Sequence, residues 1–220
     1  MKKIFASAVL ALVALAALAQ EYSTTWPYLY QEFTNGTVYM KGGTKATYDL
    51  NVHIMHSRLH FIDNGVIKEA NLAEVLLVKI GDDQYMNVDG QIMKVVKSEE
   101  RGFVAALQLG DFDKLRESGG AYGTSTTNSA TQKLSSIEVS GKVNQNHMEL
   151  REGRHNGESV DLVTTYYLVT PDKTYKASRK GIDDELDAAG KAAFKNWLKS
   201  NKVKWNNPDS IITVLDFLCK

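Results

Sequence analysis

The sequence predicts an α+β fold: an antiparallel β-meander (a hairpin-linked sheet) with a C-terminal helical segment packed on it. Asn-Gly and Asp-Gly dipeptides recur between residues 31 and 109, and they are the strongest short-range signals of a β-hairpin. After residue 182 the apolar residues follow a helical spacing. A sheet followed by helices that cover one of its faces satisfies both patterns.

The strands of the meander are predicted from the turn signals that separate them. Strands joined by such short turns are antiparallel neighbours. Asn35-Gly36 is interpreted as the turn before the first strand, and Asp82-Asp83 as the turn after the fifth. The predicted strands are 37–41, 45–54, 59–62, 66–68, 75–80, 84–88 and 91–96.

Alternation along the second strand predicts which side chains are buried. The core set is Tyr48, Leu50, Val52 and Ile54, and the exposed set is Asp49, Asn51, His53 and Met55. The run 75–78 is apolar at every position. That run predicts a strand covered on both faces.

The C-terminal part predicts one more hairpin and then helices. Residues 164–170 and 174–177 flank a Pro-Asp-Lys turn. Residues 182–189 predict a short helix that Gly190 interrupts, and 191–201 place Phe194, Trp197 and Leu198 on one helical face. Asn207-Pro208 is typical of a helix start, with an apolar stripe after it.

The chain divides into four regions. Residues 1–19 predict a signal peptide, because two lysines precede a short apolar run that ends in a small-x-small site; cleavage is expected between Ala19 and Gln20. Residues 20–117 form the meander region, and 118–136 are a Gly/Ser/Thr-rich loop, interpreted as an idle surface loop or a functional one. Residues 137–220 hold the hairpin and helices, in one compact unit with 20–117.

Composition narrows the class of protein. The 26 basic residues balance the 26 acidic ones, which argues against a nucleic-acid partner. No later segment is apolar enough to predict a transmembrane span in the mature chain. Cys219 is the only cysteine, so no internal disulfide is expected. No motif predicts a cofactor or a catalytic residue.

Two clusters of polar residues are candidate sites: three histidines between residues 53 and 60, and the basic residues between 173 and 204. His53, His56 and His60 contain enough imidazoles for a zinc site. On one continuous strand His53 faces away from the other two; a turn near Ser57-Arg58 would bring them together, but no strong turn signal is present there. The alternative is that they decorate an exposed β face. Residues 173–204 are rich in lysine, with Trp197 and Trp205 among them. They predict either an anionic-polymer site or the solvated face of a helix.

Two further patterns allow two interpretations each. A cluster of aromatics is suited either to stack on a ligand such as a sugar ring or to contribute to the core: Trp26, Tyr28, Tyr30 and Phe33. Ser210 lies in an Asp-Ser-Ile triplet that resembles the O-glycosylation acceptor of the Bacteroidetes. The same residues are also explained as a helix start.

The order of the strand motifs resembles a known group of proteins. Gly36-Thr37-Val38, Leu59-His60-Phe61-Ile62-Asp63 and the run 75–81, followed by 120–125, 166–169 and 201–205, are similar to exported Bacteroidetes proteins of unknown function. The resemblance implies export to the periplasm or beyond, and it implies no catalytic or binding residue. The expected function is a non-enzymatic binding or interaction module of the cell envelope, whose partner is an envelope protein or a glycan. The alternative is an extracytoplasmic glycan-binding protein or glycan hydrolase.

Overall fold

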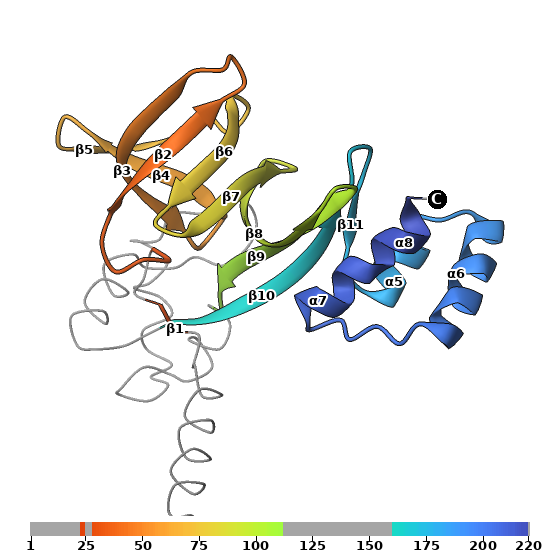
Figure 1. The fold of residues 1–220 in the computed structure, drawn as a ribbon. Coiled ribbons are helices and arrows are strands. Elements are labelled where there is room, and N and C mark those ends of the chain that lie inside the picture. Colours follow the sequence, from red (N-terminus) through yellow and green to blue (C-terminus); the bar gives the residue numbers. More distant parts are fainter. Residues whose placement is uncertain (1–22, 25–27, 112–159, 220) are drawn as a thin grey trace, which may run out of the picture.

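The computed structural model describes residues 23–24, 28–111 and 160–219, and in them it confirms the predicted α+β fold (Figure 1). The predicted signal peptide with its Ala19–Gln20 cleavage site, the loop 118–136 and Trp26 lie outside the described residues. In the described part of the chain no helix is long and apolar enough to cross a membrane.

Eleven strands in the described residues form one antiparallel sheet. The first five are β1 (Ser23–Thr24), β2 (Thr34–Met40), β3 (Lys45–His53), β4 (Arg58–Asp63) and β5 (Val66–Glu69). The next six are β6 (Val75–Ile80), β7 (Asp83–Val88), β8 (Gln91–Glu99), β9 (Gly102–Gly110), β10 (Val160–Val169) and β11 (Thr174–Lys176).

The sheet consists of two meanders that share one central pairing. Strands β2 to β5 follow one another in space, and so do β6 to β10. The chain leaves β5 and returns to the other side of β2, so that β6 pairs with β2 rather than with β5. β2 is therefore hydrogen-bonded on both edges and joins the two halves.

Gly36 is the residue that makes this central pairing possible. The sequence predicted a turn at Asn35-Gly36, and that prediction is wrong because both residues lie inside β2. Gly36 is opposite Tyr48 of β3 and Ile80 of β6. A Cβ atom at this position would overlap the carbonyl oxygen of Lys79 and lie 2.8 Å from Leu50 Cδ1. Glycine is required by the close approach of neighbouring backbones.

The sheet curls so that β4 and β8 meet, although neither pairs with the other along its length. Ile92 N–H donates to Ser57 O at 2.9 Å, and the Ser57 hydroxyl donates to Ile92 O. Both residues are about 1% exposed. The curl encloses the first core, which is made of Val38, Leu50, Val52, Leu59, Leu72, Val75, Val78, Ile80, Tyr85 and Ile92.

Burial confirms most of the predicted alternation in β3. Leu50, Val52 and Ile54 are buried as predicted. Asn51 was predicted to be exposed, but it is 1% exposed because its amide holds a neighbouring segment. Leu76 was predicted to be covered, but its side chain is 50% exposed, next to the register shift between β2 and β6.

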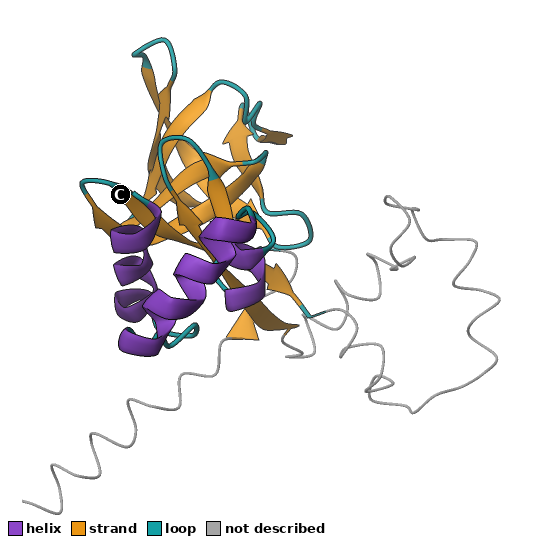
Figure 2. Cartoon of the chain, turned by 90° about the vertical axis from the view of Figure 1, so that its right-hand side faces the viewer, coloured by secondary structure: helices purple, strands orange, loops and turns teal. Residues whose placement is uncertain are grey.

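Helices cover one side of the second meander (Figure 2). They are α5 (Arg179–Asp183), α6 (Ala188–Ser200), α7 (Pro208–Ile211), the 3₁₀ helix η2 (Ile212–Val214) and α8 (Leu215–Leu218). Their apolar side chains pack with Val104 of β9 and Leu168 of β10 in a second core. The predicted Asn207 cap is confirmed, since its side chain accepts from Asp209 N–H at 2.9 Å.

Gly190 does not interrupt a helix, contrary to the prediction. It lies in the first turn of α6, where its N–H donates to the side chain of Asp187 at 2.6 Å. Asp187 is the N-cap of this helix. An N-cap aspartate satisfies a backbone N–H that has no intrahelical partner, so α6 begins at Ala188 rather than after the glycine.

Gly36→Ala tests the central pairing. The added methyl group overlaps the β6 backbone, which cannot yield without breaking the ladder, so we expect a loss of about 2–3 kcal/mol in the free energy of unfolding. Chemical denaturation of both proteins measures it. Gly42→Ala is the control, because nothing lies within 4 Å of a Cβ there. Equal stability of the two variants would show that β2 and β6 tolerate a wider spacing.

Candidate functional site

Four partly exposed rings meet beside the β3–β4 hairpin; we name Tyr28, Phe33, His53 and His60 the ring cluster. Tyr28 lies edge-on to the other three, at centroid distances of 4.9 Å to Phe33, 5.5 Å to His53 and 5.6 Å to His60. The two imidazoles stack at 5.0 Å. Edge-to-face and stacked contacts of this kind are favourable geometries for aromatic rings.

The β3–β4 turn places both histidines on one face. Residues 54–57 form the turn, and Ser57 adopts a positive φ of 50°. His60 is opposite Asn51 in the ladder, and Asn51 shares its face with His53 because side chains alternate. Of the two arrangements considered from the sequence, the structure has the one with a turn between the histidines, not the continuous strand on which His53 would face away from His60. His56 lies in the turn itself, where it is exposed.

The chain before β2 contributes the other two rings. Tyr28 forms an isolated antiparallel bridge with His53, and the next amide, Leu29 N–H, donates to Val52 O at 2.9 Å. The Tyr28 hydroxyl lies 3.0 Å from His60 Nδ1. The ring cluster thus joins residues more than twenty positions apart, and no sequence spacing reveals it.

Charged groups from β4 and β5 border the ring cluster. His60 Nε2 lies 3.5 Å from Glu69 Oε2, and Arg58 Nε lies 4.0 Å from Glu69 Oε1. Burial lowers the pKa of His60, although Glu69 partly opposes this effect. A neutral His60 with its proton on Nε2 fits both contacts: it accepts from the Tyr28 hydroxyl and faces the carboxylate with N–H.

The three histidines do not form the metal site considered from the sequence. His53 and His60 stack with 30° between their ring planes, and the two ring nitrogens of His60 face the Tyr28 hydroxyl and the Glu69 carboxylate. Among the described residues, no group of three or more His, Cys, Asp or Glu side chains is arranged to hold a metal ion.

Tyr30 lies apart from Tyr28, in a separate polar network. Its hydroxyl donates to Asp83 Oδ2 at 2.8 Å and lies 2.5 Å from the Tyr85 hydroxyl. Lys94 Nζ completes the network at 2.6 Å from Asp83 Oδ1. Burial raises the pKa of Tyr30 and of Tyr85, so both phenols stay protonated at neutral pH. Among the predicted stacking aromatics that the structure describes, Tyr28 and Phe33 belong to the ring cluster and Tyr30 does not.

Asn51 fixes the segment that carries Tyr28 and Phe33. Its Oδ1 accepts from Tyr30 N–H at 3.1 Å and from Val52 N–H at 2.9 Å. Its Nδ2 donates to Tyr30 O at 2.9 Å and to Glu32 O at 3.1 Å. One buried amide thus uses both donors and accepts twice. Asn51 therefore supports the ring cluster, although side-chain alternation alone predicted that it would be exposed.

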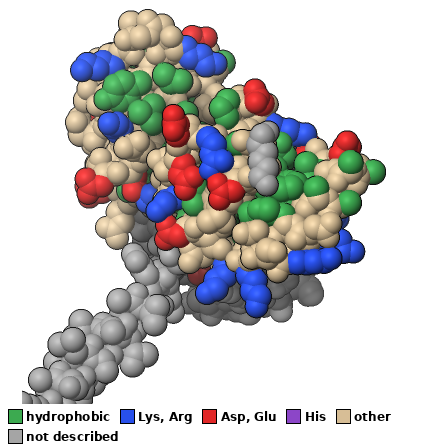
Figure 3. All heavy atoms as spheres, turned by 45° about the vertical axis from the view of Figure 1, so that its right-hand side comes forward, with side chains coloured by type: hydrophobic (Ala, Val, Ile, Leu, Met, Phe, Trp, Pro, Cys, Tyr) green, Lys and Arg blue, Asp and Glu red, His purple; other side chains and the backbone are tan. Residues whose placement is uncertain are grey.

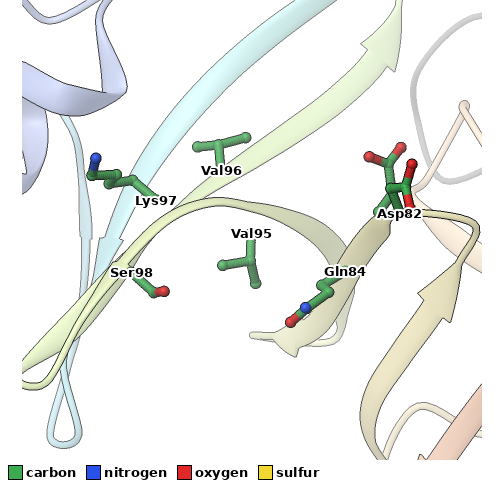
Figure 4. Close-up of a pocket in the computed structure, with 7 residues that line it drawn as sticks. Asp82, Gln84, Val95, Val96, Lys97 and Ser98 are labelled. Carbon is green, nitrogen blue, oxygen red and sulfur yellow. The ribbon is translucent and has the colours of Figure 1, made fainter.

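A shallow hollow of about 390 Å³ lies between β7 and the end of β8 (Figure 4). Asp82 and Gln84 border it on one side, and Val95 to Ser98 border it on the other. Val96 falls at a register shift in the β8–β9 ladder, so β8 bulges here. Lys97 is held by Asp209 at 2.7 Å, and Asp83 is held by Lys94 at 2.6 Å. Two of the three charged residues that line this hollow are therefore paired, and the third, Asp82, is exposed.

Ser210 is part of the α7 turn. Its Oγ accepts from Lys204 N–H at 2.9 Å, and the residue is half-buried. This hydrogen bond ties the segment after α6 to α7. O-glycosylation of Ser210 stays a prediction, and a sugar there would have to be accommodated beside this bond.

Asn51→Ala tests the support of the ring cluster. The substitution leaves buried N–H and C=O groups of the 30–32 segment without partners, so we expect a loss of about 3 kcal/mol in unfolding free energy. Asn196→Ala is the control: it removes an exposed amide from α6 and is expected to change stability by less than about 0.5 kcal/mol. A small effect at Asn51 would mean that water replaces the amide.

His60 makes stability depend on pH. Because its folded pKa lies below 6.5, the unfolded chain binds a proton at a pH at which folded His60 stays neutral. Its contribution to stability is full above pH 6.5 and is lost as the pH falls toward the folded pKa. Unfolding free energy measured between about pH 7.5 and about pH 5 should fall less steeply in His60→Gln. His56→Gln, at the exposed turn position, should keep the wild-type slope, and equal slopes in all three proteins would contradict the assignment.

Comparison of the chain with protein-family models, with curated proteins and with solved structures returned no match. The chemistry of the site is therefore described from its own groups. It contains four rings, one of which is the neutral imidazole of His60 held by the Tyr28 hydroxyl, and next to them the carboxylate of Glu69 and the guanidinium of Arg58. Such a set offers aromatic faces and hydrogen-bond partners at one place on the surface.

Proposed function

We propose that the protein is a non-enzymatic binding module of the cell envelope whose ligand face is the ring cluster. The observation that carries the proposal is that four partly exposed rings from three separate segments converge on one surface. Binding sites typically combine aromatic surface with a few placed polar groups. Arg58 and Glu69 are the polar groups at this border.

The ligand class that fits best is a glycan. A sugar ring has one apolar face that stacks on an aromatic ring, and hydroxyls at its edge that bond to charged groups. Tyr28 and Phe33 present aromatic surface, while Arg58 and Glu69 are 41% and 56% exposed in their side chains. Exposed charges next to half-buried rings match the two kinds of surface that a sugar ring offers.

The same groups are suited to hold a ligand rather than to transform it. His60 is already engaged by Tyr28 and Glu69, so its nitrogens are committed to holding the cluster. Asp83, an acid at the edge of the hollow, is tied to Lys94 and Tyr30. Hydrolysis of a glycosidic bond uses two carboxyl groups, one as acid and one as base or nucleophile, and these contacts keep Asp83 in a structural ion pair.

The exposed apolar residues support a small ligand over a protein partner. Large exposed side chains in the described residues are Val66 and Ile67 on β5, Leu76 on β6 and Val163 on β10. These strands are separated in the sheet order. In Figure 3 the green side chains of the visible face gather in separate groups, with red and blue side chains between them. A protein interface is usually marked by one contiguous apolar patch.

Export is part of the proposal. It is supported by the basic and apolar residues before Ala19 and by the resemblance to exported Bacteroidetes proteins. An envelope location places the ring cluster where polysaccharides are abundant. The periplasm and the outer surface are both consistent with this function.

Histidine ring signals in NMR test the ring cluster directly. Titration with neutral disaccharides (cellobiose, maltose and diacetylchitobiose) should shift the ring resonances of His53 and His60. The exposed His56, three residues from His53, serves as an internal reference that should not move. Tyr28→Ala should abolish the shifts, because it removes the ring that contacts both imidazoles.

Tyr39→Ala is the matched control for this experiment. Tyr39 is another partly exposed tyrosine, placed on β2 beside Lys79 and away from the ring cluster. Its loss should leave the titration unchanged. Equal shifts of all three histidines would indicate a nonspecific effect of the sugar on the solution. No shift with any sugar would contradict a glycan ligand and favour a protein partner instead.

A further inference from the structure

Helix α6 and the turn after it carry a row of lysines without acidic neighbours in sequence. Between residues 188 and 206 the chain contains five lysines and no aspartate or glutamate. Lys191, Lys195 and Lys199 recur every fourth residue along α6, and Lys202 follows its end. All four are exposed. We name these four residues the lysine row.

Four nearby acids are already engaged, three by cations and one by a backbone N–H. Asp216 of α8 pairs with Arg101, and Asp209 of α7 pairs with Lys97. On the chain before α6, Glu185 pairs with Lys173, and Asp187 accepts from Gly190 as the helix cap. Within the described ranges, no ion pair joins an acid to a residue of the lysine row. Its four positive charges are therefore not neutralised locally.

One apolar face of α6 packs inward. Phe194 is fully buried in the second core, with Trp197 and Leu198 packed against that core. The aromatic rings of the helix are therefore turned away from the lysines. Figure 1 places α6 at the outer edge of the molecule, beyond α5 and α8. The lysine row thus lies on a projecting helix rather than in a groove.

We propose that the lysine row docks the protein on the surface of an anionic phospholipid bilayer. Successive lysines are about 6 Å apart along the helix, so their charges can meet several headgroups of a flat surface together. The buried apolar face prevents α6 from inserting, so contact is electrostatic. A nucleic acid or a sugar polymer is usually held by stacking rings in a groove, and neither accompanies the lysine row.

This inference is independent of the ring cluster. The ring cluster is made by the first meander, at residues 28–60, whereas the lysine row belongs to the helices that cover the second. The two surfaces share no residue and no core. Docking through α6 would leave the ring cluster free to bind a ligand at the same time.

Vesicle sedimentation with the full chain tests the docking. The probes are vesicles of phosphatidylcholine with phosphatidylglycerol in equal parts, and vesicles of phosphatidylcholine alone, which measure any binding by the apolar N-terminal residues. Each lysine near an anionic bilayer contributes about fivefold to partition. Replacing all four by glutamine should lower the preference for anionic vesicles by several hundredfold, and salt should weaken wild-type binding.

A second quadruple variant separates position from net charge. Lys45, Lys68 and Lys79 lie on β3, β5 and β6, and Lys41 directly follows β2, so none of them belongs to the helices. Their replacement by glutamine removes the same charge. This control should keep the preference for anionic vesicles. Equal loss in both variants, or no loss in the lysine-row variant, would overturn the proposal. Retention on immobilised alginate, an acidic polysaccharide, without binding to vesicles would overturn it in favour of a polymer partner.

Discussion

The pairing of β2 with β6 is the constraint on which the rest of the structure depends. It joins two meanders that would otherwise be separate sheets, and it requires a glycine at position 36 because the β6 backbone lies where a side chain would begin. With β2 bonded on both edges, the first meander curls until Ser57 reaches Ile92 on β8. That closure encloses the first core and leaves the second meander free to carry the helices on one side.

Polar support in this fold is concentrated in a few buried groups. Asn51 bonds three backbone groups of the segment that enters β2 and one of β3. The network of Tyr30, Tyr85, Asp83 and Lys94 lies at one border of the first core. Each of these groups is expensive to leave unpaired when buried. They therefore specify one position for residues 28–33, and that position brings Tyr28 and Phe33 onto the two histidines.

The two proposed binding surfaces depend on different interactions. The ring cluster depends on shape, since its faces and borders are held by the β3–β4 turn and by Asn51. The lysine row depends on charge, since its cations are exposed and their acidic neighbours are occupied by the sheet. The ring cluster lies beside the first meander, and the lysine row lies on the helices that cover the second. A protein that docks through the lysine row can therefore keep its ligand face away from the docking surface.

The sequence by itself determined the antiparallel hairpins, the capped C-terminal helices and the buried alternation of Leu50, Val52 and Ile54. These features depend on turn residues, on helix-capping residues and on the alternation of side chains along a strand. Each of these is determined by a few neighbouring residues in the sequence. Only the tertiary structure decided that Gly36 belongs to a strand, that Asn51 is buried, that Leu76 is exposed and that His53 stacks on His60. Each of these depends on which backbone lies alongside, and the return of the chain from β5 to β2 is a long-range pairing that no local pattern encodes.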